Sequence, residues 1–179
     1  MQEEIIISGF GGQGTLLAGR IVAQAAMDLG HYVTWIPSYG PEMRGGKARC
    51  TVTIADHPIG SPLVRRPSAL IALNLPSMDA FEPLLKPNGL LIVNESLIPH
   101  KSERQDIQAV YLPASDLAKQ MGDVRMANMI CLGGLITYLD ILPIEAIEQA
   151  MHVQFPERHQ HLLETNIQAL HQGIELASS

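Results

Sequence analysis

The chain has 179 residues, of which 46% are hydrophobic and 17% are charged, and its formal net charge is −6. This length suits one compact domain, which we expect to span residues 1–179, and the acidic balance argues against a nucleic-acid-binding protein. We expect neither a membrane-spanning segment nor a secretory signal, and the apolar composition predicts that partner subunits cover part of the surface.

The number and spacing of the cysteines limit the metal and redox chemistry that this chain can carry. Cys50 and Cys131 are the only two, they stand far apart, and neither belongs to a CxxC pattern. We therefore expect no iron–sulfur cluster and no other metal site within this chain, and we expect a reducing, cytoplasmic location.

The first predicted unit is a strand, a glycine-rich turn and a helix. Residues 5–7 are three isoleucines, which indicate a buried strand, and residues 9–14 read GFGGQG. Apolar side chains then recur with a helical period over residues 15–29. Such a turn leaves backbone N–H groups free at a helix N-terminus, where the helix dipole favours an anion, so we expect a phosphate-bearing ligand. The alternative is that the glycines serve only close packing of the helix on the strand.

The same turn fits the dinucleotide fingerprint GxGxxG through Gly9, Gly11 and Gly14. A nicotinamide or flavin dinucleotide site also needs an acidic residue at the end of the second strand, where it binds the ribose hydroxyls. We predict the second strand at residues 32–36, and the residues that follow it, PSY, include no carboxylate. A nicotinamide-dependent reductase is therefore the weaker interpretation.

Residues 37–49 are predicted to form a loop, because they contain two prolines and several glycines. Arg44, Lys47 and Arg49 face only one carboxylate, Glu42, so this segment is basic in an acidic protein. In a doubly wound sheet the loop lies at the same edge as the glycine turn, where its cations suit an anionic ligand. The alternative is a solvated loop with incidental charges.

The remaining strands predict a Rossmann-like, mostly parallel sheet with flanking helices. Residues 50–55 form a strand, and residues 59–62 its short return, so we expect an antiparallel excursion or an edge strand there. Further strands are predicted at residues 69–74, 90–94 and 108–112. The first of these ends in Asn74, which either contacts a ligand or caps the next helix.

After Pro113 the chain becomes a helical segment. Helices are predicted at residues 114–121 and 126–138, from Pro143, and at residues 158–176. The second is apolar nearly all round, so we expect it to be buried, with Gly133-Gly134 permitting close contact with another helix. Core packing is the favoured interpretation, and a subunit interface is the alternative. The histidines of this segment are interpreted as solvated or structural: His152, His159, His161 and His171.

Three motifs together resemble the gamma subunit of 2-oxoacid:ferredoxin oxidoreductases, the pyruvate/2-oxoglutarate/ketoisovalerate family. They are the glycine turn at residues 9–14, SYGPEMRGG at residues 38–46 and NLPS at residues 74–77, and residues 128–133 are similar as well. The resemblance implies a heteromeric enzyme that oxidatively decarboxylates a 2-oxoacid to an acyl-CoA and passes electrons to ferredoxin. The second motif is most similar to the 2-oxoglutarate or general 2-oxoacid branch, which favours 2-oxoglutarate, although pyruvate, branched-chain and indolepyruvate members share similar gamma chains.

The resemblance also implies a division of labour among subunits. Thiamine diphosphate, Mg²⁺ and the iron–sulfur clusters belong to the alpha, beta and ferredoxin-like delta subunits, whereas the gamma chain binds coenzyme A (CoA) and is inactive alone. On this basis we expect no catalytic residue here, and the predicted ligand-binding residues are Gly9, Gly11, Gly12, Gln13, Gly14, Ser38, Tyr39, Gly40, Glu42, Arg44, Gly45, Gly46, Lys47 and Asn74. The competing hypothesis is a stand-alone nucleotide- or CoA-binding module. An isolated chain that aggregates or forms a dimer would favour a missing partner.

Overall fold

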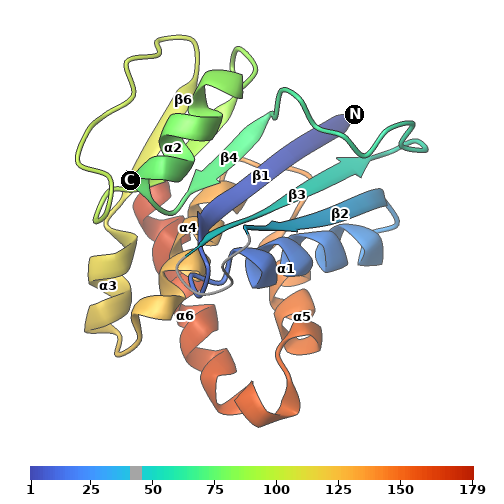
Figure 1. Ribbon diagram of the computed structural model, residues 1–179. Helices are drawn as coiled ribbons and strands as arrows, with labels where there is room; N and C mark the ends of the chain where they lie inside the picture. The colour runs from blue at the N-terminus through green and yellow to red at the C-terminus, as the bar shows by residue number, and fades with distance from the viewer. Residues whose placement is uncertain (41–45) are drawn as a thin grey trace.

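The computed structural model describes residues 1–40 and 46–179, which form a mixed sheet flanked by helices (Figure 1). The strands are β1 (Gln2–Phe10), β2 (Tyr32–Tyr39), β3 (Lys47–Ala55), β4 (Ala69–Ala72), β5 (Leu90–Asn94) and β6 (Gln108–Leu112). Their order across the sheet is β2-β3-β1-β4-β5-β6. The strands β1, β4, β5 and β6 are parallel, whereas β3 is antiparallel to both of its neighbours. The predicted α/β class with a mostly parallel sheet is confirmed.

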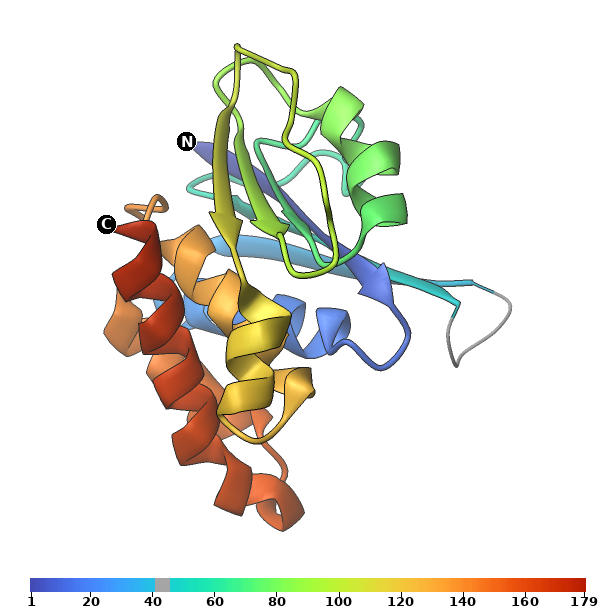
Figure 2. The same ribbon diagram turned by 90° about the vertical axis from the view of Figure 1, so that its left-hand side faces the viewer.

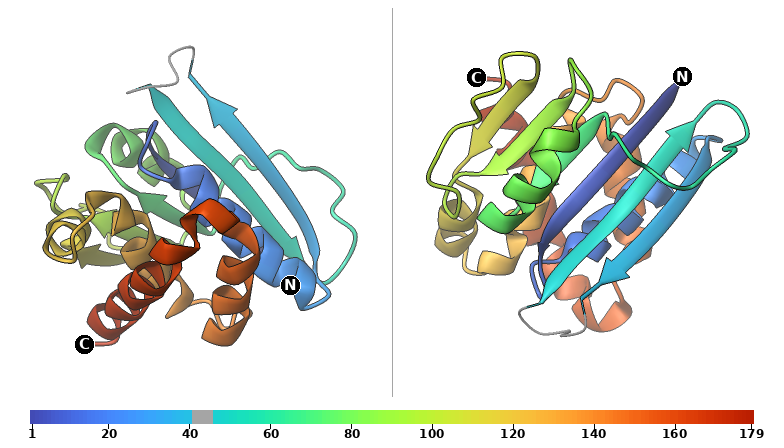
Figure 3. Two further views of the ribbon diagram at one scale, coloured as in Figure 1. Left: turned by 90° about the horizontal axis from the view of Figure 1, so that it is seen from below. Right: turned by 45° about the horizontal axis from the view of Figure 1, so that its top comes forward.

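Helices cover both faces of the sheet, and the alternation of apolar residues along β1 explains why. The helices are α1 (Thr15–Asp28), α2 (Leu75–Phe81), α3 (Ala114–Gln120), α4 (Ala127–Ile136), α5 (Ile144–Gln154) and α6 (Leu163–Ala177). Ile5 and Ile7 point into the larger core with α1 and α4, and Ile6 points into the smaller core beneath α2. Figures 2 and 3 show α2 on one face and α1 on the other.

Strands β2 and β3 form a long hairpin, where we predicted a shorter strand and a loop over residues 37–49. The sheet pairing continues to Tyr39 in β2 and starts again at Lys47 in β3. Pro37 lies within β2, which is tolerated because β2 is the edge strand of the sheet. The predicted antiparallel excursion at residues 50–55 is confirmed, but the predicted return strand at residues 59–62 is wrong. The antiparallel partners of β3 are β1 and β2, and Pro58 and Pro62 supply no N–H for a ladder.

The helical segment packs as predicted around α4, all of whose residues are buried. A methyl group on Gly133 would overlap the carbonyl of Leu170 in α6, and one on Gly173 would overlap the carbonyl of Ile130 in α4. The two helix backbones therefore touch, and only glycine fits at these two positions. The predicted helix at residues 158–176 begins differently, as a 3-10 helix (η3, Glu157–Leu162) that precedes α6.

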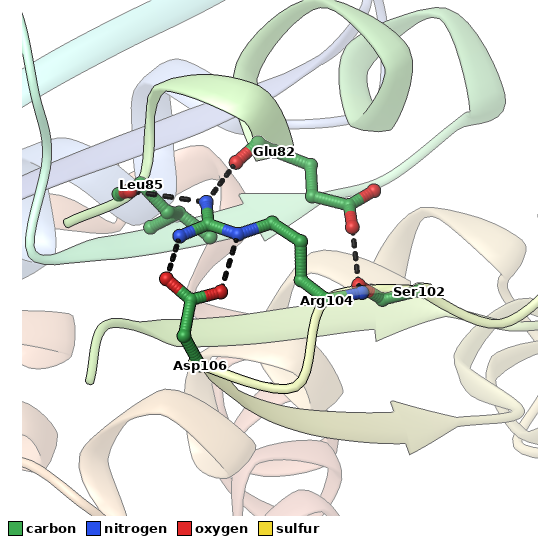
Figure 4. A network of polar contacts seen from close by, with 5 residues as sticks. All are labelled: Glu82, Leu85, Ser102, Arg104 and Asp106. Carbon is green, nitrogen blue, oxygen red and sulfur yellow. Dashed lines mark hydrogen bonds and ion pairs between the residues drawn. The ribbon is translucent and has the colours of Figure 1, made fainter. Parts of the chain in front are cut away.

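A polar network fixes the C-terminal end of α2 and the segment that follows β5 (Figure 4). The Arg104 guanidinium donates to the carbonyls of Glu82 and Leu85 at 2.8 and 3.0 Å, and it forms a bidentate ion pair with Asp106. The Ser102 hydroxyl donates to the Glu82 carboxylate. The Glu82 carbonyl also accepts the N–H of Leu85, so Arg104 is its second donor. These bonds tie the residues that follow α2 to the segment before β6. Within the described ranges, no helix has both the length and the apolar character needed to cross a membrane.

Candidate functional site

The β2–β3 hairpin and the glycine turn meet at the carboxyl end of β1. Arg49 of β3 pairs with Ser8 of β1 on one side and with Ser38 of β2 on the other, and Lys47 pairs with Phe10. Paired residues in adjacent strands point to the same face, so these side chains share the face that carries α2. The N–H of Gly11 donates to the carbonyl of Gly46 at 2.8 Å, which joins the turn directly to the hairpin. The expectation that the two segments lie side by side is therefore confirmed.

A pocket of about 410 Å³ lies between this row of side chains and α2, and we call it the hairpin pocket. Two cations and four hydroxyls line it, namely Lys47, Arg49, Ser8, Ser38, Tyr39 and Ser77. None of its described lining residues is a carboxylate. The Arg49 guanidinium lies 5.2 Å from the ring centroid of Phe81, which orients it at the pocket wall. Such a lining suits an anion with several acceptor oxygens.

Asn74 caps α2, which confirms one of the two roles that the sequence left open, and it also lines the hairpin pocket. Its Oδ1 accepts the N–H of Ser77 at 3.0 Å, and Pro76 occupies the first turn of the helix. The Ser77 hydroxyl in turn accepts a hydrogen bond from Ser8 at 2.9 Å in a buried position. This network ties the end of β1 to the start of α2, and it gives the pocket a fixed wall.

Gln13 connects the glycine turn with the end of β4. Its Oε1 accepts hydrogen bonds from the N–H of Phe10 at 2.6 Å and from the Asn74 side chain at 3.1 Å. Its Nε2 reaches the carbonyl of Leu73 at 3.4 Å. Gln13 thus orders the turn across the crevice between β1 and β4, which is the switch point of this sheet.

The glycine turn itself has the backbone that the sequence predicts. Gly12 and Gly14 have φ values of 96° and 74°, a conformation that glycine adopts without strain. Gly14 precedes α1, whose first turn has neither a side-chain cap nor an acidic residue. The Asn128 amide donates to the carbonyl of Gly14 at 3.1 Å, so the start of α4 supports the turn from behind.

The predicted ligand-binding residues divide among three places. The hairpin pocket is lined by Gly9, Ser38, Tyr39, Gly40, Lys47 and Asn74. Gly12 and Gly14 line a second hollow on the other side of the turn, and Gln13 faces a smaller one. Gly11 and Gly46 bond to each other, and Glu42, Arg44 and Gly45 lie outside the described residues.

Sequence reasoning missed the contribution of α2 to the pocket. Ser77 and Phe81 lie one turn apart on that helix and line the pocket. The sequence also places Arg49 only in a basic segment and not at a pocket wall. The signal was available in the N-cap Asn74 with Pro76, because it places the start of a helix at the carboxyl edge of the sheet.

The β3 insertion also bears on the dinucleotide alternative. In the nucleotide-binding arrangement the second strand lies beside the first, so that its terminal acid reaches the ribose. Here β3 separates β2 from β1, and β2 ends in Ser38 and Tyr39. Neither feature matches a nicotinamide site.

The thiols do not fit cluster ligation. Cys50 and Cys131 are buried in the core, and burial raises the pKa of each to about 12, so both stay protonated. Within residues 1–40 and 46–179, no group of three histidine, cysteine or carboxylate side chains is arranged to hold a metal ion.

Sequence relatives carry names from one enzyme group. Ketoisovalerate oxidoreductase subunit VorA of Methanothermobacter marburgensis is 34% identical over 96% of this chain, and the chain spans only 36% of that relative. 2-Oxoglutarate synthase subunit KorC of the same organism is 34% identical over 98% of this chain and 97% of its own length.

Solved structures agree with these relatives. The gamma subunit of a keto/oxoacid ferredoxin oxidoreductase from Geobacter sulfurreducens has a TM-score of 0.83 at 33% identity, with 98% of both chains covered. A 2-oxoglutarate:ferredoxin oxidoreductase from Magnetococcus marinus, solved with 2-oxoglutarate, coenzyme A and succinyl-CoA bound, shares the fold. Its TM-score is 0.88 at 22% identity, over 99% of this chain and 31% of that one. The family model described as pyruvate ferredoxin/flavodoxin oxidoreductase matches residues 4–176, and the chain therefore belongs to that family.

Proposed function

We propose that this chain is the gamma-type subunit of a heteromeric 2-oxoacid:ferredoxin oxidoreductase and that its hairpin pocket binds CoA. The whole enzyme would oxidatively decarboxylate a 2-oxoacid to an acyl-CoA. Among the 2-oxoacids we propose 2-oxoglutarate, because a 2-oxoglutarate synthase subunit matches this chain over 97% of that subunit's own length. The fold shared with an enzyme solved with CoA and succinyl-CoA bound supports CoA as the ligand.

One observation carries the CoA assignment: Lys47 and Arg49 stand on β3 beside four hydroxyls, with no described carboxylate in the pocket wall. CoA carries a diphosphate and a 3′-phosphate, and such groups bind best to cations with several N–H and O–H donors around them. Arg49 presents a planar fork that matches two phosphate oxygens, whereas Lys47 offers a mobile point charge. Arg44 is proposed as a further charge partner on its place in the sequence alone.

The redox chemistry would then belong to partner subunits. The two cysteines of this chain are protonated and buried, so we place the iron–sulfur clusters, thiamine diphosphate and Mg²⁺ in alpha, beta and delta subunits. Phe10 and Tyr39 border the hairpin pocket and are 38% and 57% exposed, which leaves apolar surface for such a partner. We propose that residues 1–179 act as one domain of this cytoplasmic complex.

Purification of the native complex through this chain tests the proposal. Larger subunits are expected to co-purify, with viologen reduction that depends on both a 2-oxoacid and CoA, and a panel of 2-oxoacids then identifies the substrate. Nucleotide or CoA binding by a chain that purifies alone, without such activity, would favour the stand-alone module instead.

A further inference from the structure

The second hollow lies on the opposite side of the glycine turn from the hairpin pocket, and we call it the α1 cleft. It has a volume of about 550 Å³. Three segments that are far apart in the sequence form it: the turn with Gly12 and Gly14, the start of α4 with Asn128, and the corner between α5 and α6 that contains η3.

Four of the side chains that line the α1 cleft are arginines or histidines, and apolar side chains fill much of the remaining wall: Leu17, Met126, Phe155 and Leu162. Arg125 comes from the 3-10 helix before α4 (η2, Val124–Met126), and Arg158, His159 and His161 come from η3. The single carboxylate in the lining, Asp123, is already bound to Arg125 by a bidentate ion pair, in which Nε and Nη2 donate to Oδ1 and Oδ2 at 3.0 and 2.6 Å.

The η3 side chains are available to a ligand. Arg158, His159 and His161 are exposed, and within the described ranges their side chains form no ion pair or hydrogen bond. A neutral imidazole donates one N–H and a protonated one donates two. Arg158 therefore brings a positive charge, and the three side chains bring N–H donors that no acceptor in the described residues takes up.

The glycine turn gives the α1 cleft a backbone floor that favours a compact anion. At Gly12 an added methyl group would meet no atom within 4 Å, so the backbone faces open space. The first turn of α1 is uncapped, and its N–H groups carry the positive end of the helix dipole. A phosphate group carries close to two charges and three acceptor oxygens, whereas a side-chain carboxylate carries one charge, so phosphate matches several donors better.

We propose that the α1 cleft is a second anion site, which takes the phosphate group of a small ligand and is separate from the hairpin pocket. The phosphate has two possible sources: the 3′-phosphate of a CoA that crosses the glycine turn from the hairpin pocket, or an independent phosphorylated molecule. Only the first source rests on the proposed CoA function.

Calorimetric titration of the full chain with inorganic pyrophosphate at low ionic strength tests the site. The Arg158→Ala/His159→Ala/His161→Ala variant is expected to bind at least about tenfold more weakly, because charge-assisted hydrogen bonds are lost. Equal affinity in this variant and the wild type overturns the proposal, and so does an absence of pyrophosphate binding by the wild type.

A charge-matched variant controls for the general potential of the protein. Arg65→Ala/His57→Ala/His100→Ala removes the same residue types from exposed positions that do not line the cleft. It is expected to bind pyrophosphate as the wild type does, and both variants should unfold at temperatures close to that of the wild type. An equal loss of affinity in the control variant overturns the proposal, since net charge and not the cleft would then govern binding.

CoA and dephospho-CoA, which lacks the 3′-phosphate, distinguish the two sources. If CoA supplies the phosphate, the variant with alanine at residues 158, 159 and 161 loses affinity for CoA but not for dephospho-CoA. If an independent ligand fills the α1 cleft, only pyrophosphate binding weakens, and CoA and pyrophosphate bind together. Substitutions at Arg49 test the CoA assignment itself at the hairpin pocket, so a failure of one proposal is distinguishable from a failure of the other.

Discussion

Replacing Arg49 with alanine is expected to raise the KM for CoA in the assembled enzyme. A hydrogen bond to a charged group contributes about 1.5–3 kcal/mol, which corresponds to roughly a tenfold to hundredfold weaker interaction. Arg49 lies on a regular strand between Ser8 and Ser38, and its guanidinium rests 5.2 Å from the Phe81 ring centroid. Because the side chain is held in place before the ligand arrives, little ordering offsets the contact.

The cost of the same substitution to the folded state is small. Loss of an exposed cation–π contact removes about 0.5–1 kcal/mol, or a few degrees of melting temperature for a chain of this size. Arg49→Lys keeps the charge but loses the planar fork, so its KM should fall between those of the wild type and the alanine variant. Arg65→Ala removes an exposed arginine outside the pocket and serves as the control.

The assay is steady-state viologen reduction by the purified complex, with CoA and the 2-oxoacid varied in separate series. The expected result is a raised KM for CoA with a nearly unchanged KM for the 2-oxoacid. An unchanged KM for CoA in Arg49→Ala, accompanied by the small loss of melting temperature, would show that Arg49 only packs on Phe81. The phosphate role of the hairpin pocket would then be refuted at this residue.

Three further predictions concern the folded chain. Gly133→Ala should lower the free energy of unfolding by about 1–3 kcal/mol in urea titrations, because the added methyl group forces α4 and α6 apart. This loss exceeds the gain from the better helix propensity of alanine. The control Gly60→Ala, with open space around it, should change the free energy of unfolding little. Arg104→Ala should lower it by about 1–3 kcal/mol, since the carbonyls of Glu82 and Leu85, which follow α2, lose the guanidinium as a donor, and a variant as stable as the wild type would contradict that role. Cys50 and Cys131 should not react with a thiol reagent at pH 8 in the native protein, because burial raises the pKa of each to about 12, and should react once urea unfolds it. Fast labelling of the native chain would contradict their burial.

The sequence predicts those parts of the fold that depend on local pattern. The run of isoleucines at residues 5–7, the glycine turn and the periodic residues after it define β1 and α1 without any long-range information. The buried strands β4 and β5 are continuous apolar runs, and α4 is apolar on all sides. In each case the signal and the structure lie within one short window of the chain.

The hairpin escaped prediction because its cause is tertiary. Pro37 and the surrounding glycines resemble a loop by composition, and only the position of β2 at the sheet edge makes a strand possible there. The sequence alone favours solvated or structural histidines in η3, because His159 and His161 would point to different sides of a regular helix. Their relation to Gly12 arises from contacts across nearly the whole chain, which no local pattern contains.

The insertion of β3 explains how a nucleotide-type fold acquires the hairpin pocket, which we propose binds phosphate instead of ribose. In the dinucleotide arrangement the neighbour of the first strand ends in an acid, which accepts hydrogen bonds from hydroxyl groups. Here the neighbour is antiparallel, so the beginning of β3 lies at that place, and it brings Lys47 and Arg49 beside Phe10 and Ser8. Cationic hydrogen-bond donors thereby stand where the dinucleotide arrangement has an anionic acceptor. An uncapped helix N-terminus favours anions in both arrangements, but only the cationic version adds a second attraction for phosphate and repels no part of it.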